Sequence, residues 1–316
     1  MSEKISVVLT TYNGEKYILE QLDSLKNQRV KIDEVLIADD MSTDKTVDVI
    51  KTYIEDNHLS HWKLFINDEN LGWKKNFHNI IKVAIGDVIF FSDQDDIWDI
   101  NKISEMYELM ITNKSINVLS CKAKYINSEG EKLEISSKVL PFGVDNSKDV
   151  GTIYKNCFDR KFLYSIMPGC TMCVRKSYVD FIYRINNDPI LPHDALFWKT
   201  AIILDSCYSY NKELISYRIH GDNASAPSTS ASYEIKSIEK RIEEANIFKT
   251  QIAEILVLDH YIKSKYRNDL IRIKEFTTIR NSFLEKKVSW GIIKYFYYYR
   301  DIKMFCGDVL IRLKKS

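Results

Sequence analysis

The stretch SVVLTTYNG (Ser6–Gly14) carries the pattern that decides the fold, and VLIADDMSTDKT (Val35–Thr46) and FFSDQDDIW (Phe90–Trp98) repeat it. Each stretch starts with an unbroken apolar run and then turns polar or acidic. Apolar runs without alternation are typical of strands buried on both faces of a parallel sheet. The predicted strands are Ile5–Leu9, Glu34–Ala38, Lys63–Ile66 and Val88–Phe91.

Helical periodicity fills the segments between these strands. Apolar residues recur at helical spacing over 18–25, 47–54 and 77–84, and Ser42 and Thr43 are candidate caps for the second helix. The strand starts lie roughly 25–30 residues apart, which is the length of a βαβ unit. The sequence therefore predicts an α/β fold with an open, mostly parallel sheet flanked by helices. Ligands of such sheets bind at the carboxyl ends of the strands.

Those carboxyl ends carry polar and acidic segments, namely Thr10–Asn13, Asp39–Asp40 and Ser92–Asp96. An Asp after a strand often only caps the next helix, and this reading stays open for Asp44 and for one residue of the 39–40 pair. Capping does not explain three acids within four residues at 93–96. Like charges so close together cost energy unless a cation neutralises them, and oxygen ligands suit Mg²⁺ or Mn²⁺.

Composition and length indicate an ordered globular protein. The 316 residues are 45% hydrophobic and 28% charged, which suits a catalytic domain with an appendage. The start has acidic Glu3 and a short apolar run, so we expect no signal peptide. The six cysteines are dispersed, and Cys170 and Cys173 form a C-x-x-C that lacks a second ligand pair nearby. Reduced cysteines in a cytoplasmic protein are the better interpretation.

The second half of the chain has a less regular pattern. The segment Leu191–Leu204 opens with His193 and Asp194 before a helix-like apolar run, where an Asp could equally be a cap. A strand at Leu214–Ile219 follows and ends at His220. The predicted organisation is a domain over 1–223 with halves over 1–104 and 105–223, a linker or mobile loop over 224–232, and a helical region over 233–316.

The helical region is basic and aromatic. Ser264–Ser316 holds 13 Lys and Arg against 5 Asp and Glu, whereas the whole chain has a net charge of only +1. An amphipathic, aromatic and basic stretch such as Trp290–Leu313 is typical of a membrane interface, so we expect an anionic partner surface. Two alternatives stay open. The helices could pack on the catalytic domain with solvated lysines, or they could form a homodimer interface.

Four motifs together resemble the family-two glycosyltransferases of the GT-A fold. They are SVVLTTYNGEKYILEQLDSLKNQ, VLIADDMSTDKT, NLGWKKNF and FFSDQDDIW, in this order along the chain. The chain is most similar to the bacterial branch that includes rhamnosyltransferases of cell-wall and capsular polysaccharide synthesis. The resemblance is strong over 4–104, weaker over 165–223 and absent from the C-terminal helices. The Q-x-x-R-W element of processive synthases is missing, which implies the addition of one sugar or a few.

The resemblance implies a nucleotide-diphosphate sugar donor, either dTDP-rhamnose or a UDP-hexose, and a saccharide acceptor. It makes 1–223 the GT-A catalytic domain, with 1–104 as its nucleotide-binding half and 105–223 as its acceptor half. Thr10 and Asp40 match the positions that hold the base and the ribose, and Tyr12 and Asn13 lie beside them. Arg218 is a candidate contact to the diphosphate, although an Arg at a strand edge is an equal reading.

The remaining site residues follow from the same resemblance. Asp93 and Asp95 match the D-x-D motif, in which the second acid ligates Mn²⁺ or Mg²⁺ and the first reaches the ribose or the metal. Asp96 either orients a ligand or caps a helix. His220 matches a His that joins these acids on the metal, and Asp194 matches the catalytic base. Displacement with one base implies inversion at the anomeric carbon.

Such acceptors are often sugars on a polyprenyl-diphosphate lipid, so the expected location is cytoplasmic and peripheral at the inner face of the membrane. We expect no nucleic-acid partner. A sugar nucleotidyltransferase is one alternative function, but it would want a glycine-rich basic loop where Thr10–Gly14 has one glycine and no Arg. A non-catalytic partner subunit is the other, and the intact Asp95, Asp194 and His220 disfavour it.

Overall fold

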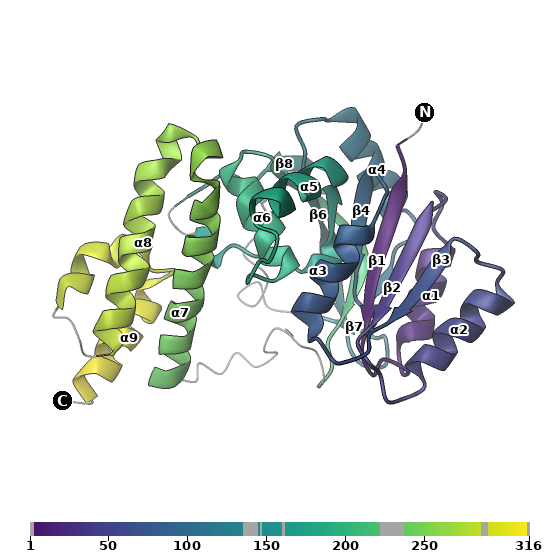
Figure 1. Cartoon of the computed structure of the whole chain (residues 1–316). Coiled ribbons are helices and arrows are strands. Elements are labelled where there is room, and N and C mark those ends of the chain that lie inside the picture. The colour runs from purple at the N-terminus through teal and green to yellow at the C-terminus, as the bar shows by residue number, and fades with distance from the viewer. Residues whose placement is uncertain are drawn as a thin grey trace.

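The computed structural model describes residues 3–134, 145, 147–159, 162–221, 237–285 and 290–314, so the expected linker over 224–232 lies outside the described residues. One ten-stranded sheet has the strand order β3-β2-β1-β4-β9-β6-β10-β5, with β7 paired to β6 and β8 to β10 (Figure 1). The strands are β1 (Ile5–Thr11), β2 (Glu34–Asp39), β3 (Trp62–Ile66), β4 (Val88–Ser92), β5 (Ile97–Trp98), β6 (Val118–Ile126), β7 (Lys132–Leu133), β8 (Ile153–Lys155), β9 (Met172–Arg175) and β10 (Cys207–Arg218).

The sheet is mixed, and its longest ladders are parallel. β1 pairs in parallel with β2 and β4, β2 with β3, and β6 with β10. The short strand β9 runs antiparallel between β4 and β6 and so joins the two parallel parts. The predicted α/β class and the four predicted strands are confirmed. β1, β2 and β4 are buried along their whole length, as their lack of alternation indicated, whereas only Trp62 of the edge strand β3 is buried.

Helices cover both faces of the sheet and extend beyond it at the C-terminal end. The α-helices are α1 (Ile18–Lys26), α2 (Thr46–Asp56), α3 (Trp73–Val83), α4 (Lys102–Thr112), α5 (Lys176–Ile185), α6 (His193–Ile203), α7 (Ile238–Ile255), α8 (Ser264–Leu284) and α9 (Ile302–Lys314). The 3₁₀ helices are η1 (Phe162–Tyr164), η2 (Gly169–Thr171), η3 (Leu256–Tyr261) and η4 (Trp290–Tyr298).

The predicted caps of α2 are wrong. Neither Ser42 nor Thr43 caps this helix, which begins at Thr46; instead, Asp44 Oδ1 accepts a hydrogen bond from the Thr46 amide at 3.0 Å. Ser42 donates its hydroxyl to Asp39 Oδ2 at 2.6 Å. The Ser42 hydroxyl therefore ties the loop after β2 to the end of that strand. Asp44, rather than Ser42 or Thr43, is the acceptor at the start of α2.

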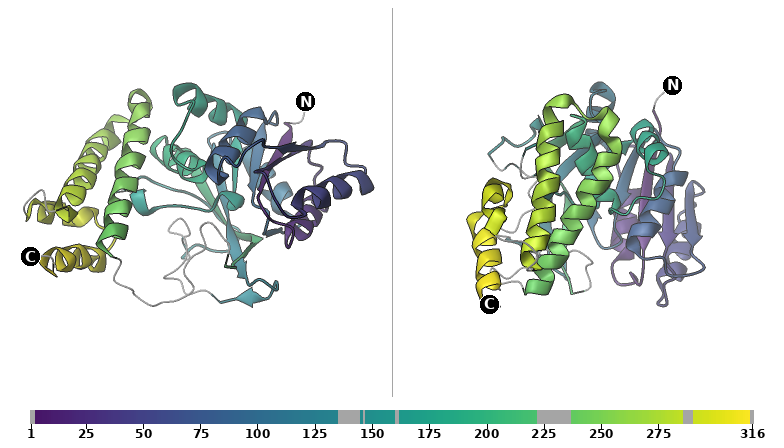
Figure 2. Two further views of the ribbon diagram at one scale, coloured as in Figure 1. Left: turned by 60° about the horizontal axis from the view of Figure 1, so that its bottom comes forward. Right: turned by 60° about the vertical axis from the view of Figure 1, so that its left-hand side comes forward.

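Two hydrophobic cores lie on opposite faces of the sheet. One packs α1, α2 and α4 through residues such as Leu22, Ile50 and Met106. The other joins α3 and α6 to the C-terminal helices, since Trp198, Ile252 and Ile273 belong to one cluster. The two views in Figure 2 place α7 and α8 beside the sheet domain at one end of the molecule. Among the described residues, no helix has the length and apolar character needed to cross a membrane.

Candidate active site

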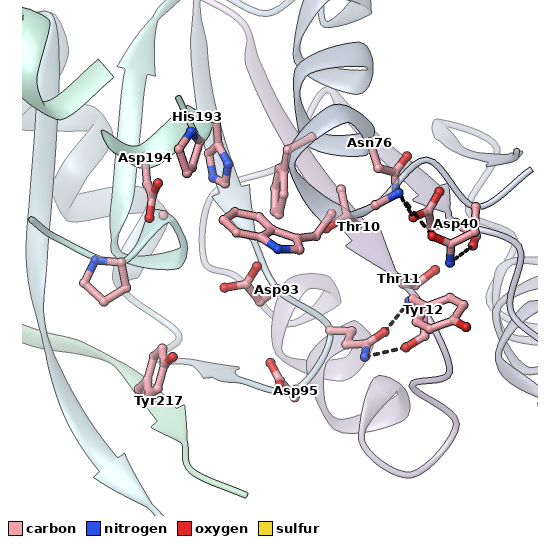
Figure 3. A pocket seen from close by; sticks show the side chains of 18 of the residues that line it. Thr10, Thr11, Tyr12, Asp40, Asn76, Asp93, Asp95, His193, Asp194 and Tyr217 are labelled. Atoms are coloured by element: carbon pink, nitrogen blue, oxygen red, sulfur yellow. Dashed lines mark hydrogen bonds between the residues drawn. The ribbon is translucent and has the colours of Figure 1, made fainter. Parts of the chain in front are cut away.

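A cavity of about 470 Å³ opens at the carboxyl ends of β1, β2 and β4 (Figure 3). Parallel strands end at the same edge of a sheet, so segments distant in sequence meet there. Six of the predicted site residues line this one cavity: Thr10, Tyr12, Asp40, Asp93, Asp95 and Asp194. Asn13, Arg218 and His220 are not among its lining residues.

Asp40 sits on one side of the cavity and is fixed by the loop before α3. Its Oδ1 accepts hydrogen bonds from the Leu71 amide and the Asn67 side chain, both at 2.8 Å, and its Oδ2 accepts from the Gly72 amide at 2.8 Å. Gly72 has a φ of +79°, a backbone conformation that favours glycine. The carboxylate is therefore held in one orientation at the rim, with Trp73 beginning α3 next to it.

Gln94 joins the loop after β1 to the acidic loop 93–96 after β4. The Gln94 side-chain amide accepts from the Tyr12 N–H at 2.8 Å and donates to the Tyr12 carbonyl at 3.0 Å. A side chain on Gly14 would collide with this amide, because its Cβ would lie 2.3 Å from Gln94 Oε1. Asn13 instead turns toward α2 and accepts from the Thr43 amide at 2.8 Å. The sequence analysis missed Gln94, whose partner is 82 residues away.

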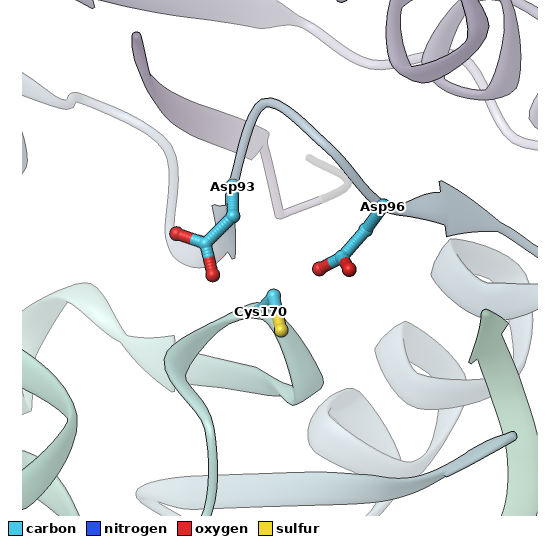
Figure 4. Close-up of side chains that lie close together, drawn as sticks. All are labelled: Asp93, Asp96 and Cys170. Carbon is cyan, nitrogen blue, oxygen red and sulfur yellow. The ribbon is translucent and has the colours of Figure 1, made fainter. Parts of the chain in front are cut away.

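Asp93 and Asp96 converge with Cys170 behind the cavity floor (Figure 4). One potential ligand atom from each residue lies within 4.8 Å of the others. Enclosure from water and repulsion by Asp96 and Asp95 raise the pKa of Asp93 well above that of a free aspartate. Burial, followed by the charge of Asp95, raises the pKa of Asp96 to about 7. The structure thus brings Asp96 into the acid cluster, and Asp96 does not cap a helix.

Asp95 forms a second, adjacent group with His220, whose Nε2 lies 2.8 Å from Asp95 Oδ2. Arg218 lies beneath this pair. Its Nε donates to the Asp95 carbonyl at 2.8 Å, its backbone amide donates to Asp96 Oδ1 at 3.0 Å, and its buried guanidinium lies over the Tyr17 ring. The guanidinium also pairs with Glu20 at 2.9 Å. Arg218 therefore supports the acidic loop from below and does not line the cavity where a diphosphate would lie.

This donor set fits a hard divalent cation. Asp96 Oδ2 is buried without a hydrogen-bond partner, which is costly for an acceptor unless another group satisfies it. Three carboxylates crowd together, their mutual repulsion contributes to the raised pKa of Asp93, and a His nitrogen adjoins Asp95. Carboxylate oxygens with one imidazole suit Mn²⁺ or Mg²⁺ better than softer metals.

Asp194 faces the acids from the opposite wall of the cavity (Figure 3). It occupies the first turn of α6, where its Oδ1 accepts from the Ala195 amide at 2.6 Å. Burial raises the pKa of Asp194 to about 6. Pro192 is the N-cap of α6 and no side-chain hydrogen bond caps this helix, so the capping interpretation of Asp194 is wrong. The carboxylate lines the cavity from within the first turn.

The C-terminal helices hold α6 at both of its ends. Before α6, Glu254 of α7 accepts hydrogen bonds from the Ile190 amide at 3.1 Å, the Leu191 amide at 2.8 Å and the Asn186 side chain at 2.8 Å. After α6, Asp205 accepts from the Tyr266 hydroxyl at 2.7 Å and pairs with Lys263. The helix that carries Asp194 is therefore positioned by residues that the sequence assigned to a separate region.

Two side chains of α6 hold the segment that forms an apolar wall of the cavity. Lys199 Nζ donates to three carbonyls of Phe162–Ser165 at 2.8 to 3.1 Å, and Trp198 Nε1 donates to the Ser165 hydroxyl at 2.9 Å. The next residues, Ile166 and Pro168, line the cavity. These hydrogen bonds hold in place the segment that brings the apolar Ile166 and Pro168 to the cavity wall.

His193 is a further lining residue that the sequence analysis did not select. Its ring stacks on Phe77 at 3.9 Å between centroids and meets Phe91 edge-on at 4.9 Å. Burial lowers its pKa well below the ordinary value, so the ring is neutral. A Cβ on Gly169 would lie 2.3 Å from His193 Nε2, so this close approach requires glycine. No sequence signal could have paired residues 169 and 193.

The matching family model and two of the matching relatives are described as glycosyltransferases. The sequence model of the family described as "Glycosyl transferase family 2" matches residues 6–180. The chain is 28% identical to the dTDP-rhamnosyl transferase RfbG of Shigella flexneri, over 88% of this chain and 96% of that protein. It is 26% identical to the uncharacterized glycosyltransferase alr2836 of a Nostoc species, over 92% and 87% of the two chains.

Solved structures with the same fold include two glycosyltransferases. Residues 1–349 of Staphylococcus aureus TarS, in complex with UDP-GlcNAc, match with a TM-score of 0.57 and 18% identity over 98% of this chain and 89% of that one. The mannosyltransferase PcManGT from Pyrobaculum calidifontis, in complex with GDP-Man and Mn²⁺, matches with a TM-score of 0.56 and 13% identity over 100% and 88%. At these identities the likeness shows the fold alone.

Proposed function

The chain belongs to glycosyltransferase family 2, and from that membership we propose that it transfers rhamnose from dTDP-rhamnose to a saccharide acceptor in bacterial polysaccharide synthesis. The observation that carries this proposal is the single cavity that holds Asp40 on one side, Asp93 and Asp95 on its floor and Asp194 on the opposite wall. A nucleotide at Asp40 would extend its diphosphate toward the acids and its sugar toward Asp194.

The proposed reaction is a single displacement. The acceptor hydroxyl oxygen attacks the anomeric carbon, the bond from that carbon to the diphosphate oxygen breaks, and the nucleoside diphosphate leaves with the bonding electrons. Asp194 accepts the proton of the hydroxyl as the new bond forms. A base with a pKa near the working pH is effective, and the value of about 6 at Asp194 meets that condition. One displacement inverts the anomeric configuration.

Asp93, Asp95 and His220 are the residues that would hold the cation. A divalent cation supplies charge neutralisation for a departing diphosphate when it is bound. Arg218 orients the Asp95 backbone through its contact at 2.8 Å, and Gln94 keeps the nucleotide loop aligned with the acidic loop. We therefore assign Arg218 and Gln94 to positioning; for Arg218 the sequence had left a diphosphate contact and a strand-edge Arg as equal readings.

Two observations favour rhamnose over a hexose as the donor sugar. The similarity to the Shigella rhamnosyl transferase runs over nearly the full length of both chains. In addition, Ile166, Pro168 and Pro192 give the cavity apolar side chains on the side of Asp194. A 6-deoxyhexose carries a methyl group where a hexose carries a hydroxyl, and an apolar wall leaves that hydroxyl without a partner.

A panel of nucleotide sugars tests the proposal through thermal stabilisation in the presence of Mn²⁺. A donor at 100 times its dissociation constant stabilises the folded state by about 2.7 kcal/mol. We expect dTDP-rhamnose to raise the Tm more than UDP-glucose, UDP-GlcNAc or GDP-mannose does, and Asp40→Asn to reduce that shift. Asp48→Asn, an exposed acid on α2, is the matched control and should behave as the wild type. A larger shift with a UDP-hexose would overturn the choice of donor.

A further inference from the structure

Helix α1 contacts both segments of the chain that carry the proposed metal ligands. Gln21 of α1 donates its side-chain amide to the Ser92 hydroxyl at 2.7 Å, and Ser92 directly precedes the acidic loop 93–96. Glu20 of α1 pairs with Arg218 at 2.9 Å, two residues before the His of the site. The start of α1 therefore borders the two segments that bring a carboxylate and an imidazole together.

Tyr17 is the N-cap residue of α1 and reaches the same place with its ring. Its backbone amide donates to the Gly14 carbonyl at 3.0 Å, which joins it to the loop after β1. The ring centroid lies 4.8 Å from that of His220, with 42° between the two planes, and Arg218 Cζ lies 4.6 Å from the Tyr17 centroid. Rings at such a separation attract each other beyond the simple burial of their area. The Tyr17 ring thus packs on the site His and on the Arg that supports the acidic loop.

The burial of Tyr17 is not explained by core packing. Its side chain belongs to a residue that is only 7% exposed, and yet Tyr17 is a member of neither hydrophobic core of the described structure, whereas the next residue, Ile18, packs in one of them. The ring contacts of Tyr17 include the polar side chains of His220 and Arg218, and Lys16 Nζ lies 4.8 Å from its centroid. The ring is therefore buried against the polar groups beside the site.

His220 is a side chain for which such a contact matters. It follows the end of β10 at Arg218, and its imidazole turns about two side-chain torsions. Its Nε2 lies 2.8 Å from Asp95 Oδ2, and its side chain is buried to 10% exposure. A ligand that is already held in its binding orientation loses less conformational entropy when its partner binds. Groups that orient metal ligands typically change the metal affinity by about 10- to 100-fold.

From these contacts we propose that Tyr17 is a positioning residue for the divalent cation site. Its ring holds the His220 imidazole toward Asp95, from the segment that joins the loop after β1 to α1. This step rests on the assignment of Asp95 and His220 to the cation, which belongs to the proposed function. Tyr17 is not among the residues that line the cavity, so it acts through His220 and is assigned no contact with the sugar nucleotide.

Mn²⁺ binding measured without turnover tests the proposal. Free Mn²⁺ is followed by electron paramagnetic resonance while the full chain is titrated, once with dTDP present and once without it. We expect Tyr17→Leu, which removes the ring, to raise the dissociation constant of Mn²⁺ by about tenfold or more. Tyr17→Phe keeps the ring and should bind Mn²⁺ as the wild type does. Tyr17→Met is the second variant if leucine prevents folding, and the same loss is expected of it.

A double-mutant cycle tests whether Tyr17 acts through His220. In a chain that already carries His220→Ala, Tyr17→Leu should leave the dissociation constant of Mn²⁺ unchanged, because there is no imidazole left to orient. A general disturbance of the site would instead weaken Mn²⁺ binding by the same factor in both backgrounds.

Tyr53→Leu is the matched control. Tyr53 is an 8% exposed tyrosine on α2 whose ring centroid lies 6.1 Å from that of Trp62. Its replacement also removes a buried ring, so the Tm should fall, and yet the dissociation constant of Mn²⁺ should stay at the wild-type value. A lower Tm alone therefore does not reproduce the effect expected of Tyr17→Leu.

Three results would overturn the proposal. They are an unchanged dissociation constant of Mn²⁺ in Tyr17→Leu, a loss of equal size in the His220→Ala background, and no Mn²⁺ binding by the wild type either with or without dTDP. A wild type that binds Mn²⁺ as expected but does not turn over dTDP-rhamnose would refute the proposed donor and leave the role of Tyr17 standing, so the two failures are distinguishable.

Discussion

Asp194 is a buried carboxylate whose pKa decides when it can accept a proton. Burial raises that pKa to about 6, so the carboxylate is protonated below that value and cannot act as a base. We expect kcat/KM for transfer to fall as the pH is lowered through 6 and to level off above about 7. Asp194→Asn should reduce kcat by roughly 10²- to 10⁴-fold and remove this acid limb, while donor-induced stabilisation persists. An unchanged acid limb in the variant would assign it to another group.

Arg218 supports the acidic loop through a planar fork that lysine cannot reproduce. Groups that orient metal ligands typically influence metal affinity about 10- to 100-fold. Arg218→Lys should therefore raise the Mn²⁺ concentration at half-maximal activity by about that factor, with a smaller effect at saturating Mn²⁺. Arg267→Lys, an exposed arginine on α8, is the control. If Arg218 contacted the diphosphate directly, the loss would appear in the donor KM and would persist at saturating Mn²⁺.

For individual residues, the sequence predicted the acids that line the cavity but not the side chains that hold the surrounding loops in position. Asp40, Asp93 and Asp95 were conspicuous as acids after buried strands, and Asp194 was selected through the family resemblance; the cavity brings the four together. Gln94 and His193 were missed. Their roles depend on Gly14 and Gly169, which leave space for them, and such non-local fits have no signature in the local pattern.

The placement of α6 is the element-scale feature with the most direct consequence for activity. Glu254→Ala would leave the Ile190 and Leu191 amides and the Asn186 side chain without their acceptor. Small displacements of a catalytic group are costly, so we expect kcat for transfer to fall about tenfold or more while the donor KM changes little. Glu243→Ala, an exposed acid on α7, should have neither effect. A loss confined to the donor KM would contradict this coupling.

Elements with strong periodicity were predictable and the short ones were not. The four apolar runs became β1 to β4. Burial on both faces gives β1, β2 and β4 an unambiguous pattern, whereas β3 lies at the edge of the sheet and is mostly exposed. The strand β9 has only four residues and runs antiparallel between two longer strands, which no local signal specifies. The caps predicted at Ser42 and Thr43 are wrong because Asp39 accepts the Ser42 hydroxyl and Asn13 accepts the Thr43 hydroxyl.

For the whole molecule, the C-terminal helices depend on the buried Asp308. Asp308→Asn would leave Arg241 and Arg280 without their shared counter-ion. Removing one partner of a buried ion pair typically costs about 3–5 kcal/mol, so we expect a loss of that size in the free energy of unfolding measured with urea. Asp269→Asn on α8 is the control. A loss below 1 kcal/mol would show that the cluster is not required for packing.

The central claim is that one cavity binds a nucleotide sugar and activates its transfer, and turnover of the donor measures this most directly. We would follow release of dTDP from dTDP-rhamnose with Mn²⁺ present, using water as the acceptor. The prediction is turnover by the wild type and by Asp48→Asn, with loss of at least about 10²-fold in Asp95→Asn and Asp194→Asn and no turnover after chelation of the metal. Equal turnover in the wild type and both active-site variants would contradict the account.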